Sequence, residues 1–149
     1  MKRYFVKIIN NQNLIDFASI SEIKLLGFHE VKSITKHKIY SICGDIGIKQ
    51  VNLICEQLLV DPVIEQYQVN KVELIKNVSR VNIWYKEGVL DVVANNICKG
   101  VKYLDIKTPL EVHCGTQITF IPKIGLQQID KILKKVFINE LIEEYKILK

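Results

Sequence analysis

The chain has 149 residues, of which 48% are hydrophobic and 25% are charged, a composition typical of a globular protein with one good core or two small ones. No apolar window is long enough for a transmembrane helix, and the short apolar run at the N-terminus is not typical of a secretory signal, so we expect a cytoplasmic protein. The net charge of +5 comes from scattered lysines without a long basic run, which indicates ordinary surface charge rather than a nucleic-acid or membrane surface.

The first half of the chain predicts six elements in order. Residues 3–9 (RYFVKII) are rich in β-branched and aromatic types, which favours a strand. A helix follows at 14–26, and residues 30–43 predict two short strands around a turn. A second helix covers 46–59, and VIEQYQV, which begins after Pro62, leaves it as a final strand.

The second half repeats this order after a shift of 78 positions. LLVDPVIEQY at 58–67 returns as VFINELIEEY at 136–145, and the shift aligns the halves without a gap. The copies of the elements are a strand at 81–86, a helix at 92–104, a strand pair at 108–121 and a helix at 124–137. Both second helices carry apolar residues at i, i+3, i+7 and i+10, at Ile48, Val51, Cys55 and Leu58 and again at Leu126, Ile129, Leu133 and Val136.

Each unit therefore reads β-α-β-β-α-β, and the fold class is α+β with two tandem ferredoxin-like repeats packed as a pseudo-dimer. We expect a first repeat at 1–71, a linker at 72–79 and a second repeat at 80–149. The strands carry more apolar residues than a one-sided sheet needs, so we expect the sister repeat to cover the second face of each sheet. In the repeated phrase, Ile64, Tyr67, Ile142 and Tyr145 are predicted to be core and junction residues, with Glu65 at the surface.

A search for catalytic chemistry gives no nucleophile, metal site or phosphate loop. The four cysteines form no C-x-x-C pair and are expected to be buried apolar residues rather than zinc ligands. Cys114 follows His113, and we predict a turn at His113–Thr116 in which Gly115 can take positive φ. The elbow that presents a nucleophile on a tight turn is missing there, so we expect no catalytic, metal or cofactor-binding residue.

One loop stands out as a candidate contact surface. KEGVLD at 86–91 places Lys86, Gly88 and Asp91 before a predicted helix, where free amides could bind an anion and Asp91 is suited to cap the helix. A glycine-rich turn at this place also occurs in tandem small-molecule-sensing modules of the ACT kind, which share the topology and form the alternative interpretation. The aromatic pattern of RNA-binding ferredoxin-like sheets is absent.

Several of these motifs together resemble a known family. LGFHEVKSI, with Leu26-Gly27-Phe28 after the first helix, and CEQLLVDPVIEQY from Cys55 to Tyr67 resemble the PurS family, the small subunit of phosphoribosylformylglycinamidine (FGAM) synthase. Asp61 stands where that family often has Asn. The second copy carries the K-x-G-V-x-D entry to the first helix at 86–91, whereas NNQNLID in the first copy departs from it.

The resemblance implies a non-catalytic subunit in purine biosynthesis. Two fused copies are similar to the PurS-like region of the large single-chain synthase. The implied partners are the large ATP-using synthetase subunit and the glutaminase subunit, which the chain would bridge while assisting ammonia transfer. A homodimer of the tandem chain is a further possible assembly. ATP and magnesium belong to the complex and not to this chain, and the loop with Lys86, Gly88 and Asp91 is the expected partner contact.

Overall fold

The computed structural model describes residues 1–12 and 15–148 and has two successive sets of elements. The first repeat comprises β1 (Lys2–Asn10), α1 (Phe17–Leu25), β2 (Ser33–Gly44), α2 (Ile48–Ile54), the π-helical turn η1 (Cys55–Leu59) and β3 (Glu65–Val69). The second repeat comprises β4 (Ser79–Tyr85), α3 (Val92–Val101), the 3-10 turn η2 (Lys102–Leu104), β5 (Glu111–Ile121), α4 (Leu126–Ile132), the π-helical turn η3 (Leu133–Phe137) and β6 (Glu143–Leu148).

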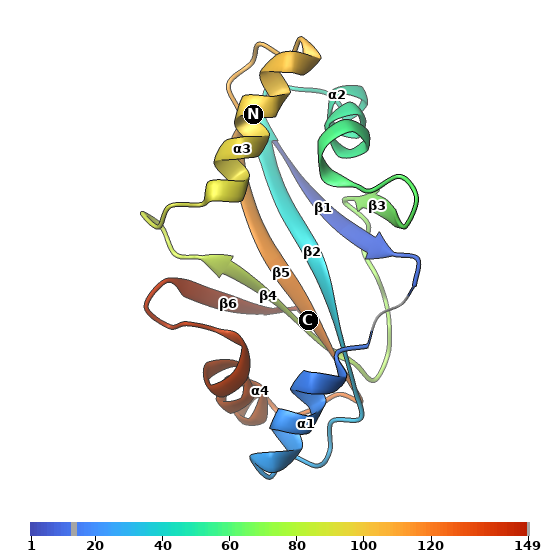
Figure 1. Ribbon diagram of the computed structural model, residues 1–149, viewed down its shortest axis with the longest axis vertical. Coiled ribbons are helices and arrows are strands. Elements are labelled where there is room, and N and C mark those ends of the chain that lie inside the picture. The colour runs from blue at the N-terminus through green and yellow to red at the C-terminus, as the bar shows by residue number, and fades with distance from the viewer. Residues whose placement is uncertain (13–14, 149) are drawn as a thin grey trace.

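All six strands form one antiparallel sheet in the order β3-β1-β2-β5-β4-β6 (Figure 1). At its centre β2 pairs with β5 from Ser33, opposite Ile121, to Cys43, opposite Glu111. Lys38 lies opposite Thr116, which is its own copy 78 positions later, so the pseudo-twofold axis that relates the repeats passes through this pair. The α+β class and the two ferredoxin-like repeats are thereby confirmed.

The predicted strand pairs at 30–43 and 108–121 are wrong, because each is a single long strand. The turn expected at His113–Thr116 is absent, since these residues pair in the ladder with Lys38–Ser41. Where a hairpin would fold back on its own repeat, each strand runs straight on into the sister repeat. The second half of β2 pairs with β1, and the second half of β5 pairs with β4.

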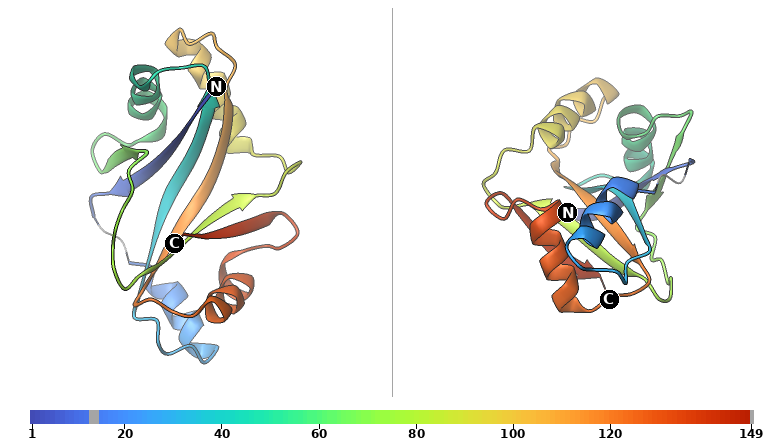
Figure 2. Two further views of the ribbon diagram at one scale, coloured as in Figure 1. Left: turned by 180° about the vertical axis from the view of Figure 1, so that it is seen from behind. Right: turned by 60° about the horizontal axis from the view of Figure 1, so that its bottom comes forward.

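This straightening exchanges a helix and half a strand between the repeats. The first core joins β1, β3, α2 and the second half of β2 with α3 and the first half of β5. The second core joins β4, β6, α4 and the second half of β5 with α1, which contributes Ile20 and Ile23, and the first half of β2. Figure 2 shows α1 beside α4 at one end and α3 beside α2 at the other. Each ferredoxin-like unit is thus completed by its sister, as in a domain swap.

All four helices lie on the same face of the sheet. In β2, Ile34 faces the second core, whereas Tyr40 and Ile42 face the first. Because residues an even number apart in a strand point to the same side, both cores lie on one face of the sheet. The sister repeat therefore does not cover the opposite face, contrary to the sequence-based expectation, because the repeats join edge to edge instead. We call this opposite side the open face.

The segment from β3 to β4 crosses the open face. Both carboxylate oxygens of Glu73 lie 3.1 Å from Nζ of Lys7 in β1, and its Oε2 lies 3.2 Å from Nη1 of Arg80 in β4. The side chains of all three residues are at most 16% exposed, so Glu73 pairs with a cation from each repeat under little solvent screening.

The 78-position register holds for most of the chain but not for its first strand and helix. Asp16 caps α1 by accepting from the amide of Ser19, and Asp91 caps α3 by accepting from the amide of Ala94, 75 positions further on. The difference of three is taken up after α3, where η2 adds three residues. The gapless alignment was therefore wrong for β1 and α1, although the predicted strands themselves are present.

The predicted helix stripes are confirmed at their middle positions, where Val51, Cys55, Ile129 and Leu133 are buried, and are wrong at their first positions. Ile48 is 49% exposed and Leu126 is 67% exposed, whereas Val51, Ile54 and Cys55 are buried together with their copies Ile129, Ile132 and Leu133, and Leu59 is buried in the first repeat only. The last turn of each helix is a π turn, closed by the amide of Val60 on the Cys55 carbonyl and of Ile138 on the Leu133 carbonyl. The wider turn brings Leu59, which is 6% exposed, to the buried side in place of the predicted Leu58, which is 37% exposed.

The repeated phrase forms the same exit in both repeats. The side chains of Asp61 and Asn139 each accept a hydrogen bond from the amide two residues further on. The amide of Asp61 donates to Glu65 at 2.9 Å, and the amide of Asn139 donates to Glu143 at 3.0 Å. Glu65 is not at the surface as expected: its side chain is 12% exposed.

The tyrosines of the phrase are junction residues, as predicted. Tyr67 packs against the first core and donates to Glu56, and Tyr145 packs against the second core and donates to Asp130. Ile142 is 37% exposed and is not a core residue.

Candidate partner-binding site

The predicted contact loop borders a groove on the open face. The groove has a volume of about 650 Å³ and is lined by residues of both repeats, among them Arg3, Phe5, Trp84, Lys86, Gly88 and Asp91. The structure thus brings all three predicted site residues to one surface feature, together with the first strand of the sister repeat.

The loop is held in place by backbone hydrogen bonds. The amide of Lys86 donates to the carbonyl of Ile142 at 2.8 Å, and the amide of Val89 donates to the carbonyl of Lys86 at 3.2 Å. Gly88 has a φ of +85°, which is the conformation that the third position of a type II turn requires. Lys86 and Glu87 are exposed at this turn and are available for contact.

Asp91 has a structural task in addition to lining the groove. Its Oδ1 accepts from the amide of Ala94 at 2.9 Å, which caps α3, and its Oδ2 accepts from the amide of Cys114 at 3.0 Å. The second bond ties the loop to the central strand β5. The interpretation of Asp91 as a helix cap is therefore confirmed.

The groove floor is aromatic and its rim is charged. Phe5 of β1 and Trp84 of β4 meet edge to face, with ring centroids 6.3 Å apart. Around them lie cations and anions of both repeats: Arg3, Lys86, Glu87, Glu111, Glu144 and Lys146. An apolar centre with a rim of mixed charge is typical of a protein-binding surface.

The cysteine and histidine at this groove are not arranged for catalysis. Nε2 of His113 lies 2.7 Å from Oε1 of Glu111, and this hydrogen bond lowers the pKa of Glu111. Cys114 points to the helix side of β5 and packs against the first core. Burial, and then the nearby Asp91 carboxylate, raise the pKa of the Cys114 thiol to about 12, so the thiolate is scarce at neutral pH.

The described residues hold no group of three metal-ligating side chains, and within the same residues no helix is long and apolar enough to cross a membrane.

The sequence did not single out Phe5, Trp84 and Arg3 as site residues. Alternation in RYFVKII does place Arg3 and Phe5 on the face opposite Tyr4 and Val6, but it does not say which face the helices leave free. Glu65 and Glu143 were identical in both copies and were assigned no task beyond the surface.

Comparison with known proteins gives one family. The model of a family described as PurS, phosphoribosylformylglycinamidine (FGAM) synthase, matches residues 19–73 and again residues 78–149. The two matches cover most of the chain, and each match falls on one of the two repeats of the structure. No curated protein matches the chain.

Proposed function

We propose a role for this chain in FGAM synthase, because the chain belongs to the PurS family of that enzyme and so to purine biosynthesis. The role is that of a non-catalytic subunit that bridges the glutaminase and the ATP-dependent synthetase subunits and assists the transfer of ammonia between them. ATP and magnesium are expected on the large subunit and not on this chain.

The groove on the open face is the observation that carries this proposal. It is built by both repeats, has an aromatic floor and charged rim, and includes no activated nucleophile. The predicted contact residues Lys86 and Gly88 lie at its edge on an ordered turn. A surface of this kind supports recognition of another protein rather than chemistry on a small substrate.

A bridging subunit also needs rigidity between two partners. The exchange of α1 and α3 means that each core contains elements of both repeats, so the repeats cannot separate without opening both cores. We expect one partner to bind at the groove on the open face while the helix face remains free for another contact. The continuous sheet would then hold both partners at a fixed distance.

The proposal is tested by reconstitution with the cognate large and glutaminase subunits. Arg3→Glu and Lys86→Glu reverse exposed charges at the groove, and Lys76→Glu makes the same change in the exposed connection between β3 and β4, outside the groove lining and away from the helices, as a matched control. We expect the two groove variants to weaken co-purification and to lower FGAM formation from glutamine more than formation from ammonium chloride. Equal effects of all three variants, or none from the groove variants, would contradict the assignment of the groove.

A further inference from the structure

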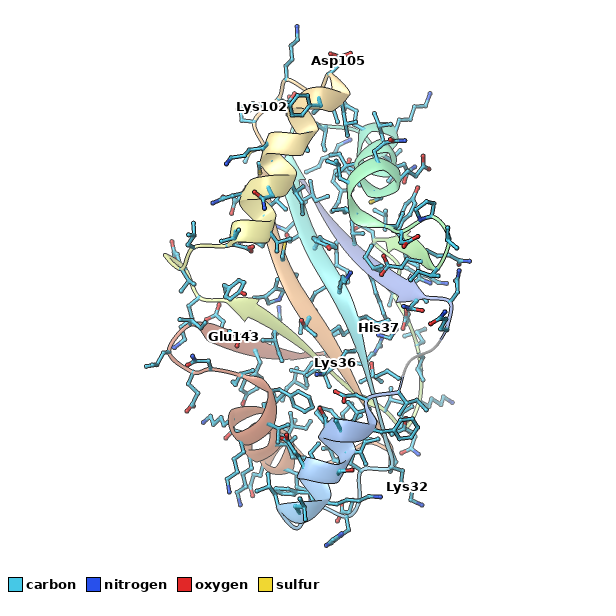
Figure 3. The ribbon with its side chains drawn as sticks, viewed as in Figure 1. Lys32, Lys36, His37, Lys102, Asp105 and Glu143 are labelled. Carbon is cyan, nitrogen blue, oxygen red and sulfur yellow. The ribbon has the colours of Figure 1, made fainter. Side chains whose placement is uncertain are left out.

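Two clefts related by the pseudo-twofold axis lie on the helix face, on either side of the Lys38–Thr116 pair. The cleft of the first repeat has a volume of about 410 Å³ and is lined by Asn10, Lys36, Lys38 and Glu65 among others. Its copy, which we call the acidic cleft, measures about 130 Å³ and is lined by Tyr85, Asp91, Val93, Cys114, Thr116 and Glu143. Lys36 lies near the centre of the view in Figure 3, and Glu143 lies at the start of β6.

In the first repeat, each acidic side chain at this place holds a lysine of the same repeat. Nζ of Lys36 lies 2.8 Å from Oδ2 of Asp16, and Nζ of Lys38 lies 3.7 Å from Oε2 of Glu65. The carboxylates are 19% and 12% exposed, whereas the lysine side chains are 46% and 65% exposed, so water still screens both ion pairs. The other oxygen of Glu65 accepts from the amide of Asp61.

In the second repeat, the same acids remain and the lysines are missing. Asp91 and Glu143 are the copies of Asp16 and Glu65, but Cys114 and Thr116 stand in place of the two lysines. Glu143 keeps the structural bond, through Oε1, to the amide of Asn139. Across residues 1–12 and 15–148, no cationic group lies within 4.0 Å of the carboxylate of Asp91 or Glu143.

We propose that the acidic cleft binds a lysine side chain of a partner protein, in the place where the first repeat carries Lys38. The sister repeat gives the identity of the occupant, since the same fold with the same acids holds an alkylammonium group there. Thr116, the copy of Lys38, supplies no cation, and the acidic cleft beside it measures about 130 Å³. Because Glu65 of the first repeat is already paired with Lys38, the partner binds one side of the pseudo-symmetric chain only.

This contact goes beyond the proposed function. Only the identity of the protein that supplies the lysine rests on the proposed function. A lysine inserted at Glu143 reaches the helix face, opposite the groove at Phe5 and Trp84. The chain as a whole carries a charge of +5, so the attraction for a cation is local to this cleft.

The test uses n-butylammonium chloride, a mimic of the lysine side chain, and amide NMR spectra of the full chain at constant ionic strength. We expect saturable shifts at Asp91, Cys114 and Thr116. Glu143→Gln keeps the oxygen that accepts from Asn139, so the fold is retained, and it should weaken binding by about tenfold or more. Thr116→Lys supplies the missing lysine from the chain itself and should abolish the shifts. Glu65→Gln is the matched control in the sister cleft and should leave them unchanged.

Three results would overturn the proposal. The first is the lack of saturable shifts in the unmodified chain, and the second is binding that Glu143→Gln does not alter. The third is an equal response to ammonium chloride and to n-butylammonium chloride, which would indicate a site for the free ammonium ion instead of a side chain. Since the probe is a small amine, none of these results depends on the synthase subunits.

Discussion

Replacing Phe120 with alanine tests whether the two repeats form one cooperative unit. Phe120 is fully buried in β5, and its core contains Ile20 and Ile23 of α1 from the other repeat. Truncation of a buried phenylalanine costs about 3 to 5 kcal/mol, and the edge-to-face contact with Phe137, at 6.2 Å between ring centroids, falls within that loss. A chain of this size is stable by about 5 to 15 kcal/mol, so a large part of the total is removed.

The assay is thermal unfolding followed by calorimetry and by circular dichroism. At roughly 2 to 4 °C per kcal/mol, the Tm should fall by about 6 to 20 °C. The decrease should appear as one transition, with both signals coincident, because α1 and β2 lose their packing together with α4 and β5. Leu126→Ala, at a position that is 67% exposed on α4, is the matched control and should change the stability by about 0.5 kcal/mol or less. Two separate transitions, with one at the original Tm, would refute the exchange of helices between the repeats.

Further predictions concern ionisable groups and ligands. Glu73→Gln removes the charge that two largely buried cations share, and it should lower the stability to urea by about 1 to 3 kcal/mol; an unchanged midpoint would mean that the linker is not fastened to the sheet. Burial raises the pKa of Asp16, but hydrogen bonds from Lys36 and Ser19 lower it more, so the folded pKa lies below the ordinary value. Its contribution is therefore present above the unfolded pKa and is lost as the pH falls through the folded pKa, and the acid decrease of Tm should be shallower in Asp16→Asn. The thiol of Cys114, with a pKa of about 12, should react with iodoacetamide at pH 7 far more slowly than a free cysteine peptide, as mass spectrometry would reveal. Free amino acids should leave the Tm unchanged, whereas a clear rise with one of them would favour the sensing module of the ACT kind.

The local elements of the fold were accessible from the sequence because their signals are local. Apolar and β-branched runs indicated β1 and β4, and apolar spacing, with Asp91 as a cap before α3, indicated the four helices within a few residues. The boundary at residues 13 and 14, where the first helix was expected to begin, lies outside the described part of the chain. The duplication also followed from the sequence, since a fixed shift preserves the identity of residues such as Gln50 and Gln128.

The connection of the repeats was not accessible in the same way. A strand that folds back as a hairpin and a strand that continues into a sister repeat carry the same β propensity at Lys36–Tyr40. The choice depends on pairing with β5, a long-range contact that no local pattern encodes. The cover of the open face was misjudged for the same reason: the segment between β3 and β4 crosses it through Glu73, the sister repeat does not, and Phe5 lies beside Trp84 in a groove.

The candidate site was predicted in part. Lys86, Gly88 and Asp91 were found because a glycine before a helix cap is a local signal, and they do line the groove. The acidic cleft was missed because its meaning lies in a comparison of repeats: Lys38 beside Glu65 in one, and Thr116 beside Glu143 in the other. That contrast requires the 78-position register together with the fold.

The bridging role of the chain is tested by FGAM formation in the reconstituted enzyme. The large and glutaminase subunits are mixed with and without this chain, and the product is measured with glutamine and with ammonium chloride as the nitrogen source. We expect that the chain has no activity by itself, that it is retained with both subunits on a sizing column, and that glutamine-dependent formation requires it. Glutamine-dependent formation at the full rate without the chain, or turnover by the chain alone that is lost in Cys114→Ala, would exclude a non-catalytic bridging role.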